Sequence, residues 1–392
     1  MTVHENLLPS SLAVLGSTGT VGMQGLDVAR KKGISVCLLA AHSNIERLEE
    51  QIREFHPRFC SVFDKEAGAA LRIAVADTDT EILLGEEGLL YAIEACDASV
   101  YLNAILGEAG LLPTLAVLKT GKRLALSNKE SLVIAGDIVN EHRARYGAEM
   151  IPVDSEHSAI FQSLKSGRSD EIKKIILTAS GGPFYGFTKE QLRSVTLADT
   201  LKHPTWQMGA KITVDSATMM NKGFEVIEAF HLFHVRPEQV QVTVHKESII
   251  HSAVEYIDNT VIAELSVPDM RACVQYALTY PARTTAVIEP LDLFSVKNLS
   301  FLPPDTEKFP LLPLAFSAIA DGGAVPATLN AADEIAVAAF LREKIPFSKI
   351  SDIVIDTVDT LRGQAKNAAS LDEILSFDRE ARELAALRIS AL

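Results

Sequence analysis

Residues 12–22 have the sequence LAVLGSTGTVG, in which a short apolar run leads directly into a turn that contains three glycines. Glycines permit a tight turn and let the backbone approach a ligand closely. The helical pattern that follows would present free N–H groups at its N-terminus to a pyrophosphate. The segment therefore predicts a phosphate-binding loop at the start of a βαβ unit. Because its spacing is GxxGxxG rather than GxGxxG, a purely structural turn stays open as an alternative.

Outward from this loop, short apolar runs alternate with longer helical patterns as far as residue 150. Apolar positions three and four apart in Val21–Lys32 and Ile45–Phe55 predict helices between strands. This rhythm predicts an α/β fold, with an N-terminal Rossmann-type parallel sheet domain over residues 1–150. The predicted strands are Leu12–Leu15, Val36–Ala41, Phe59–Val62, Ala98–Asn103 and Arg123–Ser127.

Beyond residue 150 the loops become longer, more polar and richer in glycine. Residues 151–280 are predicted to form an α/β catalytic domain, with strands at Lys174–Thr178, Gln241–His245 and Val261–Leu265. Residues 281–310 are rich in proline and have little periodicity, which predicts a linker. Residues 311–392 are predicted to form a C-terminal helical bundle domain, with helices at Leu314–Ala320, Ala327–Glu343 and Leu371–Leu387.

The composition indicates a multidomain globular protein, with 392 residues of which 47% are hydrophobic and 22% charged. Its net charge of −14 argues against nucleic-acid or anionic-membrane partners. The longest apolar runs are too short to span a membrane, and Met1–Asn6 lacks the pattern of a secretory signal. The four scattered cysteines form no CxxC pair. We therefore expect a cytoplasmic protein.

Two carboxylates, Asp154 and Glu156, follow the end of a strand pattern. Residues two apart at a strand end point the same way, so both could share one target. Carboxylate oxygens in a loop suit Mg²⁺ or Mn²⁺, with a third carboxylate arriving from elsewhere. The alternative is that Asp154 or Ser155 caps a helix that begins near Ser158. His157 beside them is more often a structural residue than a ligand.

Residues 212–225 (ITVDSATMMNKGFE) are dense in groups that bind anions and metals. The hydroxyl of Ser216, the amide of Asn221 and the ammonium of Lys222 could together hold a phosphate. Glu225 lies three residues after Lys222 and therefore on the same helical face. The alternative for that pair is an ordinary surface ion pair.

Three loops add to this pattern. HPTWQMG (residues 203–209) carries the only tryptophan and suits a lid that excludes water, although tryptophan is also a common core residue. TASGGP (residues 178–183) follows a strand, and its amides and Ser180 could bind an anion. The second strand is followed by His42, Ser43 and Asn44, which include no carboxylate to bind a ribose 2′-hydroxyl. That absence favours NADPH over NADH.

Taken in order, these segments closely resemble one family, the 1-deoxy-D-xylulose 5-phosphate reductoisomerases of the non-mevalonate isoprenoid pathway. The resemblance covers nearly the whole chain, and its strings DSEH and DSATMMNKG are highly specific. The matching strings are GSTGTVG (16–22), AGLLPTL (109–115), SNKESLV (127–133), DSEHSAIFQ (154–162), ASGGPF (179–184), HPTWQMG (203–209), VDSATMMNKGFEVIEA (214–229), PDMR (268–271) and LNAADEIAVAAFL (329–341).

The resemblance implies a role for each group of candidate residues. It implies that Asp154, Glu156 and Glu225 hold a divalent metal, Mg²⁺, Mn²⁺ or Co²⁺. The catalytic residues that it implies are Lys129, Glu156, His203 and Glu225. It assigns substrate contacts to Lys129, Ser155, Glu156, Ser180, His203, Ser216, Asn221, Lys222 and Glu225, with Ser180, Ser216, Asn221 and Lys222 around the phosphate. NADPH contacts would come from Thr18, Gly19, Thr20, Val21, His42, Ser43, Asn44, Asn128, Glu130 and Gly209, and the flap would carry Trp206 and Met208.

The activity implied by the resemblance is the NADPH- and metal-dependent rearrangement and reduction of 1-deoxy-D-xylulose 5-phosphate to 2-C-methyl-D-erythritol 4-phosphate, by a homodimer. The chain departs from the family at His42 and Ser43, where a small and a basic residue are frequent, and at Ala210, where a basic residue is frequent. These departures concern the preference for NADPH and the charge of the flap.

Two other functions fit parts of the pattern. A semialdehyde-type dehydrogenase also opens with a glycine-rich NADP loop, but its chemistry needs an activated cysteine nucleophile. A catalytically silent NADPH-binding protein would not need the carboxylate trio or the phosphate-binding segment.

Overall fold

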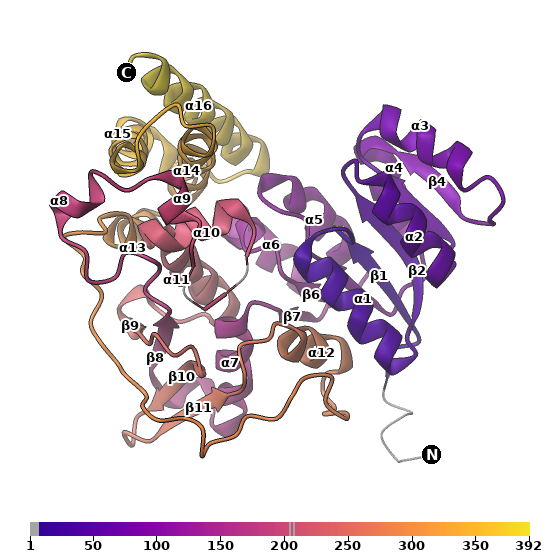
Figure 1. The fold of residues 1–392 in the computed structure, drawn as a ribbon, viewed down its shortest axis with the longest axis horizontal. Coiled ribbons are helices and arrows are strands. Elements are labelled where there is room, and N and C mark those ends of the chain that lie inside the picture. Colours follow the sequence, from indigo (N-terminus) through magenta and orange to yellow (C-terminus); the bar gives the residue numbers. More distant parts are fainter. Residues whose placement is uncertain (1–7, 204, 207) are drawn as a thin grey trace. The chain divides into compact units, whose positions relative to one another are not determined.

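The computed structural model describes residues 8–203, 205, 206 and 208–392. The prediction that Met1–Asn6 lacks a secretory signal concerns residues outside this description. Its contacts divide the chain into two compact units, shown together in Figure 1. Unit 1 contains the described residues up to Ser131, together with Val139–Ser158 and Asp269–Glu289. Unit 2 contains Leu132–Ile138, Ala159–Pro268 and Pro290–Leu392.

Unit 1 is built on a seven-stranded parallel sheet with the order β4-β3-β2-β1-β5-β6-β7. The strands are β1 (Ser11–Leu15), β2 (Ser35–Ala41), β3 (Phe59–Val62), β4 (Glu81–Leu84), β5 (Val100–Asn103), β6 (Arg123–Leu126) and β7 (Met150–Pro152). All five strands predicted before residue 130 are confirmed, whereas β4 was not predicted. The strand order reverses between β1 and β5, which is where doubly wound sheets bind dinucleotides. The α/β fold class is confirmed.

The helices of unit 1 begin and end where the side chains favour it. Asn44 accepts a hydrogen bond from the backbone N–H of Arg47, and Gly33 ends the first helix in the left-handed conformation. The helices are α1 (Thr20–Lys32), α2 (Ile45–Phe55), α3 (Lys65–Ala74), α4 (Gly85–Ala95) and α5 (Leu111–Lys119). Two further helices, α6 (Glu130–Tyr146) and α7 (Ser155–Ser163), contribute residues to both units.

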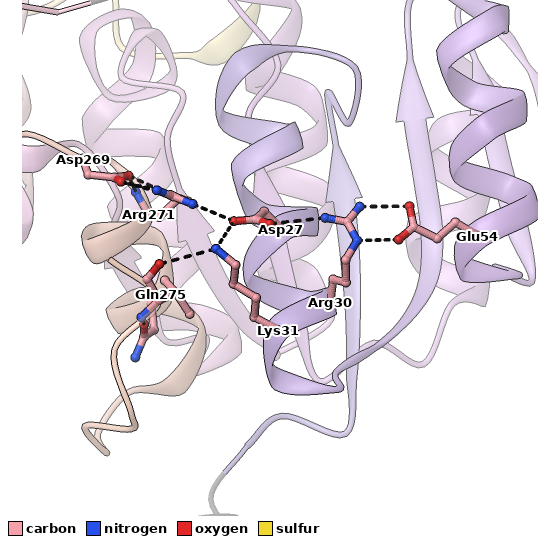
Figure 2. A network of polar contacts seen from close by, with 8 residues as sticks. Asp27, Arg30, Lys31, Glu54, Asp269, Arg271 and Gln275 are labelled. Carbon is pink, nitrogen blue, oxygen red and sulfur yellow. Dashed lines mark hydrogen bonds and ion pairs between the residues drawn. The ribbon is translucent and has the colours of Figure 1, made fainter. Parts of the chain in front are cut away.

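Helix α12 (Arg271–Thr279) belongs to unit 1 although the strands of unit 2 precede it in the chain. Figure 2 shows the charged network that joins it to α1. Arg271 Nη1 lies 3.0 Å from Asp27 Oδ2, and Lys31 Nζ lies 2.9 Å from the same oxygen. Burial raises the pKa of Asp27, but the hydrogen bonds from Lys31 and Arg271 outweigh it and hold the pKa below its ordinary value. The carboxylate is therefore ionised and bound between two cations.

Unit 2 contains a four-stranded sheet with the order β11-β10-β8-β9. Its strands are β8 (Ile172–Ala179), β9 (Val240–Val244), β10 (Ile250–Tyr256) and β11 (Val261–Leu265). Three of the four were predicted, and β10 was not. Strand β8 pairs in parallel with β9 and antiparallel with β10. The helices that follow β8 are α8 (Lys189–Leu192), α9 (Leu197–Thr200), α10 (Ala210–Thr218) and α11 (Met220–Phe233).

The last part of unit 2 is helical, as predicted. Helix α14 packs against α15 and α16, and it also contacts α10. The helices are α13 (Leu311–Asp321), α14 (Val325–Leu341), α15 (Phe347–Ala365) and α16 (Leu371–Ser390), of which α15 was not predicted. None of the helices in the described part of the chain has the length and apolar character that crossing a membrane requires.

Candidate active site

The loop after β1 leaves no room for a Cβ at Gly16 or at Gly22. The backbone N–H groups of Gly16 and Ser17 both donate to Ala40 O, each at 2.8 Å. A Cβ on Gly22 would lie 2.1 Å from Gly16 O. Gly19 stands at the N-cap of α1 and provides no side-chain cap, so no side chain of its own covers the amides of the first turn. The start of α1 thus leaves backbone amides available to an anion, and binding of a pyrophosphate there stays a prediction.

A residue that the sequence did not single out supports this loop. Gln51 on α2 accepts a hydrogen bond from Ser17 Oγ at 2.7 Å and donates to Ser17 O at 3.0 Å. Both side chains are buried. Since the two residues are 34 positions apart, no local motif could have revealed the contact.

The remaining residues predicted to contact NADPH in unit 1 lie in the loops that follow β2 and β6, except Glu130, which begins α6. His42, Ser43 and Asn44 are exposed, and His42 stacks on Phe63 with ring centroids 5.3 Å apart. Asn128 is buried and donates to Ile105 O, to Gly107 O and to Glu130 Oε2. Its amide thus holds the loop that follows β5. Gly209, the tenth predicted residue, lies in unit 2 at the N-cap of α10.

Lys129 and the predicted carboxylates of unit 1 meet at the start of α7. Lys129 Nζ lies 2.6 Å from Asp154 Oδ2, and both side chains are largely buried. The backbone carbonyl of Asp154 accepts the N–H of Ser158, and its side chain accepts the N–H of Ser155. Asp154 therefore stands directly before α7 and is also paired with a cation. Ser155 Oγ donates to Glu156 Oε2 at 2.5 Å.

His157 is fully buried, and its Nδ1 lies 3.8 Å from Asp154 Oδ2. This position agrees with the structural role that the sequence favoured for it.

Ser180 and His203 come together in unit 2. Ser180 Oγ and His203 Nε2 are 2.9 Å apart, and His203 Nδ1 accepts the backbone N–H groups of Thr205 and Trp206. Because Nδ1 acts as acceptor, the proton of the neutral ring belongs on Nε2, which then donates to Ser180. Burial lowers the pKa of His203, which favours this neutral form. The histidine thus fixes the start of the predicted flap and orients the Ser180 hydroxyl.

The flap residues themselves lie in segment 203–209, of which Pro204 and Gln207 are outside the described residues. The Trp206 ring lies 6.1 Å from the His251 ring at an interplanar angle of 51°. Met208 is half-buried.

The corner between α10 and α11 collects the densest group of predicted residues. The chain turns at Met219, which has a φ of 61°, an unusual value for a residue with a side chain. The first two turns of α11 then carry Asn221, Lys222 and Glu225. Asn221 Nδ2 donates to Glu225 Oε1 at 2.5 Å, and Lys222 Nζ pairs with Glu225 Oε2. The Lys222 and Glu225 side chains are only 5% and 1% exposed, so the alternative of a surface ion pair is wrong.

The loop that carries Ser180 packs against this corner. Gly181 and Gly182 have φ values of 85° and 65°, and a Cβ on Gly182 would lie 2.6 Å from Ser216 O. Only glycine permits this approach. Unit 2 therefore brings the four predicted phosphate contacts, Ser180, Ser216, Asn221 and Lys222, onto one loop and one helix corner that touch each other.

The cysteines do not support the semialdehyde-type alternative. Three of the four are buried, and the half-buried Cys37 has its sulfur 2.7 Å from that of Cys96. The thiol of Cys37 thus faces another thiol, whereas a nucleophile would need a base beside it.

Three family models match the chain. Residues 12–136 match the model described as 1-deoxy-D-xylulose 5-phosphate reductoisomerase, and residues 150–233 match the C-terminal domain of the same enzyme. Residues 265–384 match the model described as DXP reductoisomerase C-terminal domain.

Curated relatives with this name align over nearly their whole length. The protein of Acetivibrio thermocellus is 49% identical over 373 residues, which are 95% of this chain and 97% of the relative. The protein of Geotalea uraniireducens is 46% identical over 374 residues, or 95% of this chain and 96% of the relative.

Solved structures agree with the sequence comparison. A DOX-P reductoisomerase in complex with NADPH, fosmidomycin and magnesium superposes with a TM-score of 0.93 at 39% identity, covering 97% of this chain and 98% of the other. The Zymomonas mobilis reductoisomerase in complex with NADPH gives a TM-score of 0.91 at 39% identity, covering 98% and 100%. With this agreement over sequence, fold and length, the chain belongs to the 1-deoxy-D-xylulose 5-phosphate reductoisomerase family.

Proposed function

We propose that the chain converts 1-deoxy-D-xylulose 5-phosphate to 2-C-methyl-D-erythritol 4-phosphate, with NADPH as reductant and a divalent metal ion. The observation that carries this proposal is the buried corner of unit 2, where Asn221, Lys222 and Glu225 stand on one helical turn beside the Ser180 loop. A buried cation, an amide and hydroxyls suit a phosphate, and the carboxylate beside them suits a metal ion.

The residues of unit 1 fit NADPH. The glycine turn after β1 leaves no room for a Cβ at Gly22, and the start of α1 offers backbone amides to a pyrophosphate. Thr18, Gly19, Thr20 and Val21 would line this part of the cofactor site. His42, Ser43 and Asn44 would face the adenosine ribose, where no carboxylate repels a 2′-phosphate. The proposed NADPH contacts are completed by Asn128, Glu130 and Gly209. When bound, NADPH supplies the hydride for the reduction.

The donor set proposed for the metal consists of oxygens only. Asp154, Glu156 and Glu225 would supply hard carboxylate ligands, which suit Mg²⁺, Mn²⁺ or Co²⁺. Magnesium is present in three of the similar solved structures. When bound, such an ion supplies Lewis acidity and neutralises negative charge.

The side chains of the chain itself bind and orient the substrate. Ser180, Ser216, Asn221 and Lys222 grip the phosphate, which supplies binding energy far from the reacting carbons. The Lys129 ammonium, held beside Asp154, offsets negative charge that develops on substrate oxygens. His203 donates from Nε2 to Ser180 and fixes the start of the flap, and Trp206 and Met208 exclude water when the flap closes. Ser155 orients Glu156 through its hydroxyl.

The proposal also assigns tasks along the chain. Residues 1–150 bind NADPH, residues 151–280 bind metal and substrate, residues 281–310 link, and residues 311–392 form the helical domain that supports the second part. We further propose that the protein is a cytoplasmic homodimer, whose mass light scattering would measure.

The test is to follow NADPH oxidation by absorbance with 1-deoxy-D-xylulose 5-phosphate, with and without Mg²⁺ or Mn²⁺. Metal-dependent loss of NADPH is the expected result. A folded protein that binds NADPH but oxidises none with either metal would contradict the proposal.

A further inference from the structure

A charged side-chain cluster joins the C-terminal helices to the phosphate corner. Lys211 Nζ on α10 lies 2.6 Å from Asp215 Oδ2 on the same helix and 3.0 Å from Asp333 Oδ2 on α14. The Asp333 side chain is 0% exposed and that of Asp215 is 4% exposed. The Lys211 ammonium, on a side chain that is 27% exposed, thus donates to two buried carboxyl groups, and one of these belongs to a residue 122 positions away.

The charges of this cluster balance only if one proton is shared. Two ionised carboxylates beside one ammonium would leave a net negative charge in the interior, which is strongly disfavoured. Burial and the neighbouring Asp333 raise the pKa of Asp215 to about 8, although Lys211 opposes them. Burial also raises the pKa of Asp333, and Glu334 beside it adds to the effect. At neutral pH the cluster is therefore an ammonium, a carboxylate and a carboxylic acid.

The cluster connects directly to the groups proposed to bind phosphate. Asp215 precedes Ser216 in the last turn of α10, and Asp215 O accepts the hydroxyl of Thr218 at 3.1 Å. Ser216 O in turn faces the backbone of Gly182 in the Ser180 loop. A displacement of Asp215 would move both sides of the phosphate grip, because the loop has no free space against Ser216.

We propose that Asp333 is a positioning residue for the substrate's phosphate, which acts through Lys211 and Asp215 to hold Ser216 and the Ser180 loop in place. This inference rests on the proposed function, because it concerns the phosphate of that substrate. By this inference, the C-terminal helix α14 contributes to binding of the substrate's phosphate. Phosphate binding should also weaken in alkaline solution, as the shared proton is lost and the two carboxylates repel each other.

The test compares Asp333→Asn and Asp333→Ala with a matched control, Asp378→Asn. Asp378 is also buried and paired, 2.6 Å from Nε of Arg382 on its own helix, α16. For each protein, KM and kcat for 1-deoxy-D-xylulose 5-phosphate are measured between about pH 7 and pH 9. Calorimetric titration with inorganic phosphate gives the affinity of the grip without turnover, and NADPH titration reports on unit 1.

The wild type is expected to lose affinity for substrate and for inorganic phosphate by about fivefold across this range, with a smaller change in kcat. Asp333→Asn needs no shared proton, since its neutral amide leaves Lys211 paired with an ionised Asp215. Its KM should therefore stay flat with pH. Asp333→Ala should raise KM about tenfold at pH 7 and weaken phosphate binding equally, while Asp378→Asn follows the wild type.

If Asp333 has a purely structural role, both variants should melt at a lower temperature, and KM of Asp333→Asn should vary with pH as it does in the wild type. That result would overturn the inference. Phosphate affinity equal to the wild type in a folded Asp333→Ala would overturn it as well. If Asp333→Ala does not fold, the isosteric Asp333→Asn and its pH profile decide. If the wild type shows no activity, the proposed function is contradicted. The titrations with inorganic phosphate would still test whether Asp333 positions the phosphate-binding residues.

Discussion

Glu225 is held by two neighbours on its own helical turn, Asn221 and Lys222. Replacing it by glutamine keeps the shape but removes one charge from the proposed metal ligands. We expect Glu225→Gln to abolish turnover, since metal affinity depends on that charge. NADPH binding should be unchanged, because it depends on the glycine turn of unit 1. Absorbance assays and NADPH fluorescence titration measure the two effects.

Glu255→Gln serves as the control for this change, because Glu255 pairs with Lys173 and Lys174 at the surface of the same unit. Its activity should match that of the wild type. Normal activity in Glu225→Gln would remove Glu225 from the set of metal ligands.

Two glycines of the cofactor turn differ in the space around them. A Cβ on Gly22 would lie 2.1 Å from Gly16 O, whereas a Cβ on Gly19 would lie 3.4 Å from it. We expect Gly22→Ala to destabilise the protein by about 1–3 kcal/mol, because the backbone has to move to accept the methyl group. Gly19→Ala should melt as the wild type does. Thermal melting without NADPH tests the difference, and equal melting temperatures would show that the turn yields easily.

Sequence could identify residues of the site only where they stand close together in the chain. Ser216, Asn221, Lys222 and Glu225 fall within one segment, so their types and spacing indicated a phosphate and metal site. Gln51 and Asp333 could not be found in this way, because their partners are 34 and 122 positions away. The burial of the Lys222–Glu225 pair could not be predicted from the sequence either. The spacing shows that the two residues share a helical face, but it does not show which other elements cover that face.

At the scale of elements, the joint between α1 and α12 depends on charge. Arg271 is bound to Asp27 and to Asp269 and is itself only partly exposed. We expect Arg271→Ala to loosen α12, with a cost of about 1 kcal/mol, because Asp27 and Asp269 lose a shared cation. Hydrogen exchange should then be faster in α12 and unchanged in the helices of unit 2.

The control for this experiment is Arg168→Ala, which removes the ion pairs of an exposed arginine with Asp170 and Glu171. Arg168→Ala should leave the hydrogen exchange of α12 and of the helices of unit 2 unchanged. Equal protection of α12 in Arg271→Ala and in the wild type would mean that apolar packing alone holds that helix.

The elements that the sequence predicted are those with a clear apolar pattern and a turn at each end. The short buried runs of β1, β2 and β3 are examples. Strand β4 was missed because EILL at the sheet edge is short and half-exposed, so it lacks both alternation and a long apolar run. Helix α15 contains SDIVIDTV, whose β-branched residues disfavour a helix locally. Packing against α14 outweighs that preference.

For the whole molecule, the buried histidine of α11 links stability to pH. Burial lowers the pKa of His231 to about 4, although Asp137 opposes this shift. The unfolded chain binds a proton there below about pH 6.5, whereas the folded chain does so only near pH 4, so acid favours unfolding. We expect stability to fall by up to about 1.4 kcal/mol per pH unit between these values.

Urea unfolding at several pH values tests this, with His231→Gln expected to show a shallower fall toward acid. His142→Gln is the control, because His142 is only partly buried on α6. An unchanged slope in His231→Gln would assign the acid sensitivity to other groups.

The return of α12 to unit 1 has a consequence for synthesis on the ribosome. Unit 1 is completed only by Asp269–Glu289, after the whole sheet of unit 2 has emerged. At a translation rate of about 5–20 residues per second, α1 waits for its partner for tens of seconds. During that wait the face of α1 that later meets α12 shows Asp27 and Lys31, which water solvates readily. The charged residues at this joint thus keep part of the unfinished surface hydrated, whereas an entirely apolar joint would offer other chains a surface on which to aggregate.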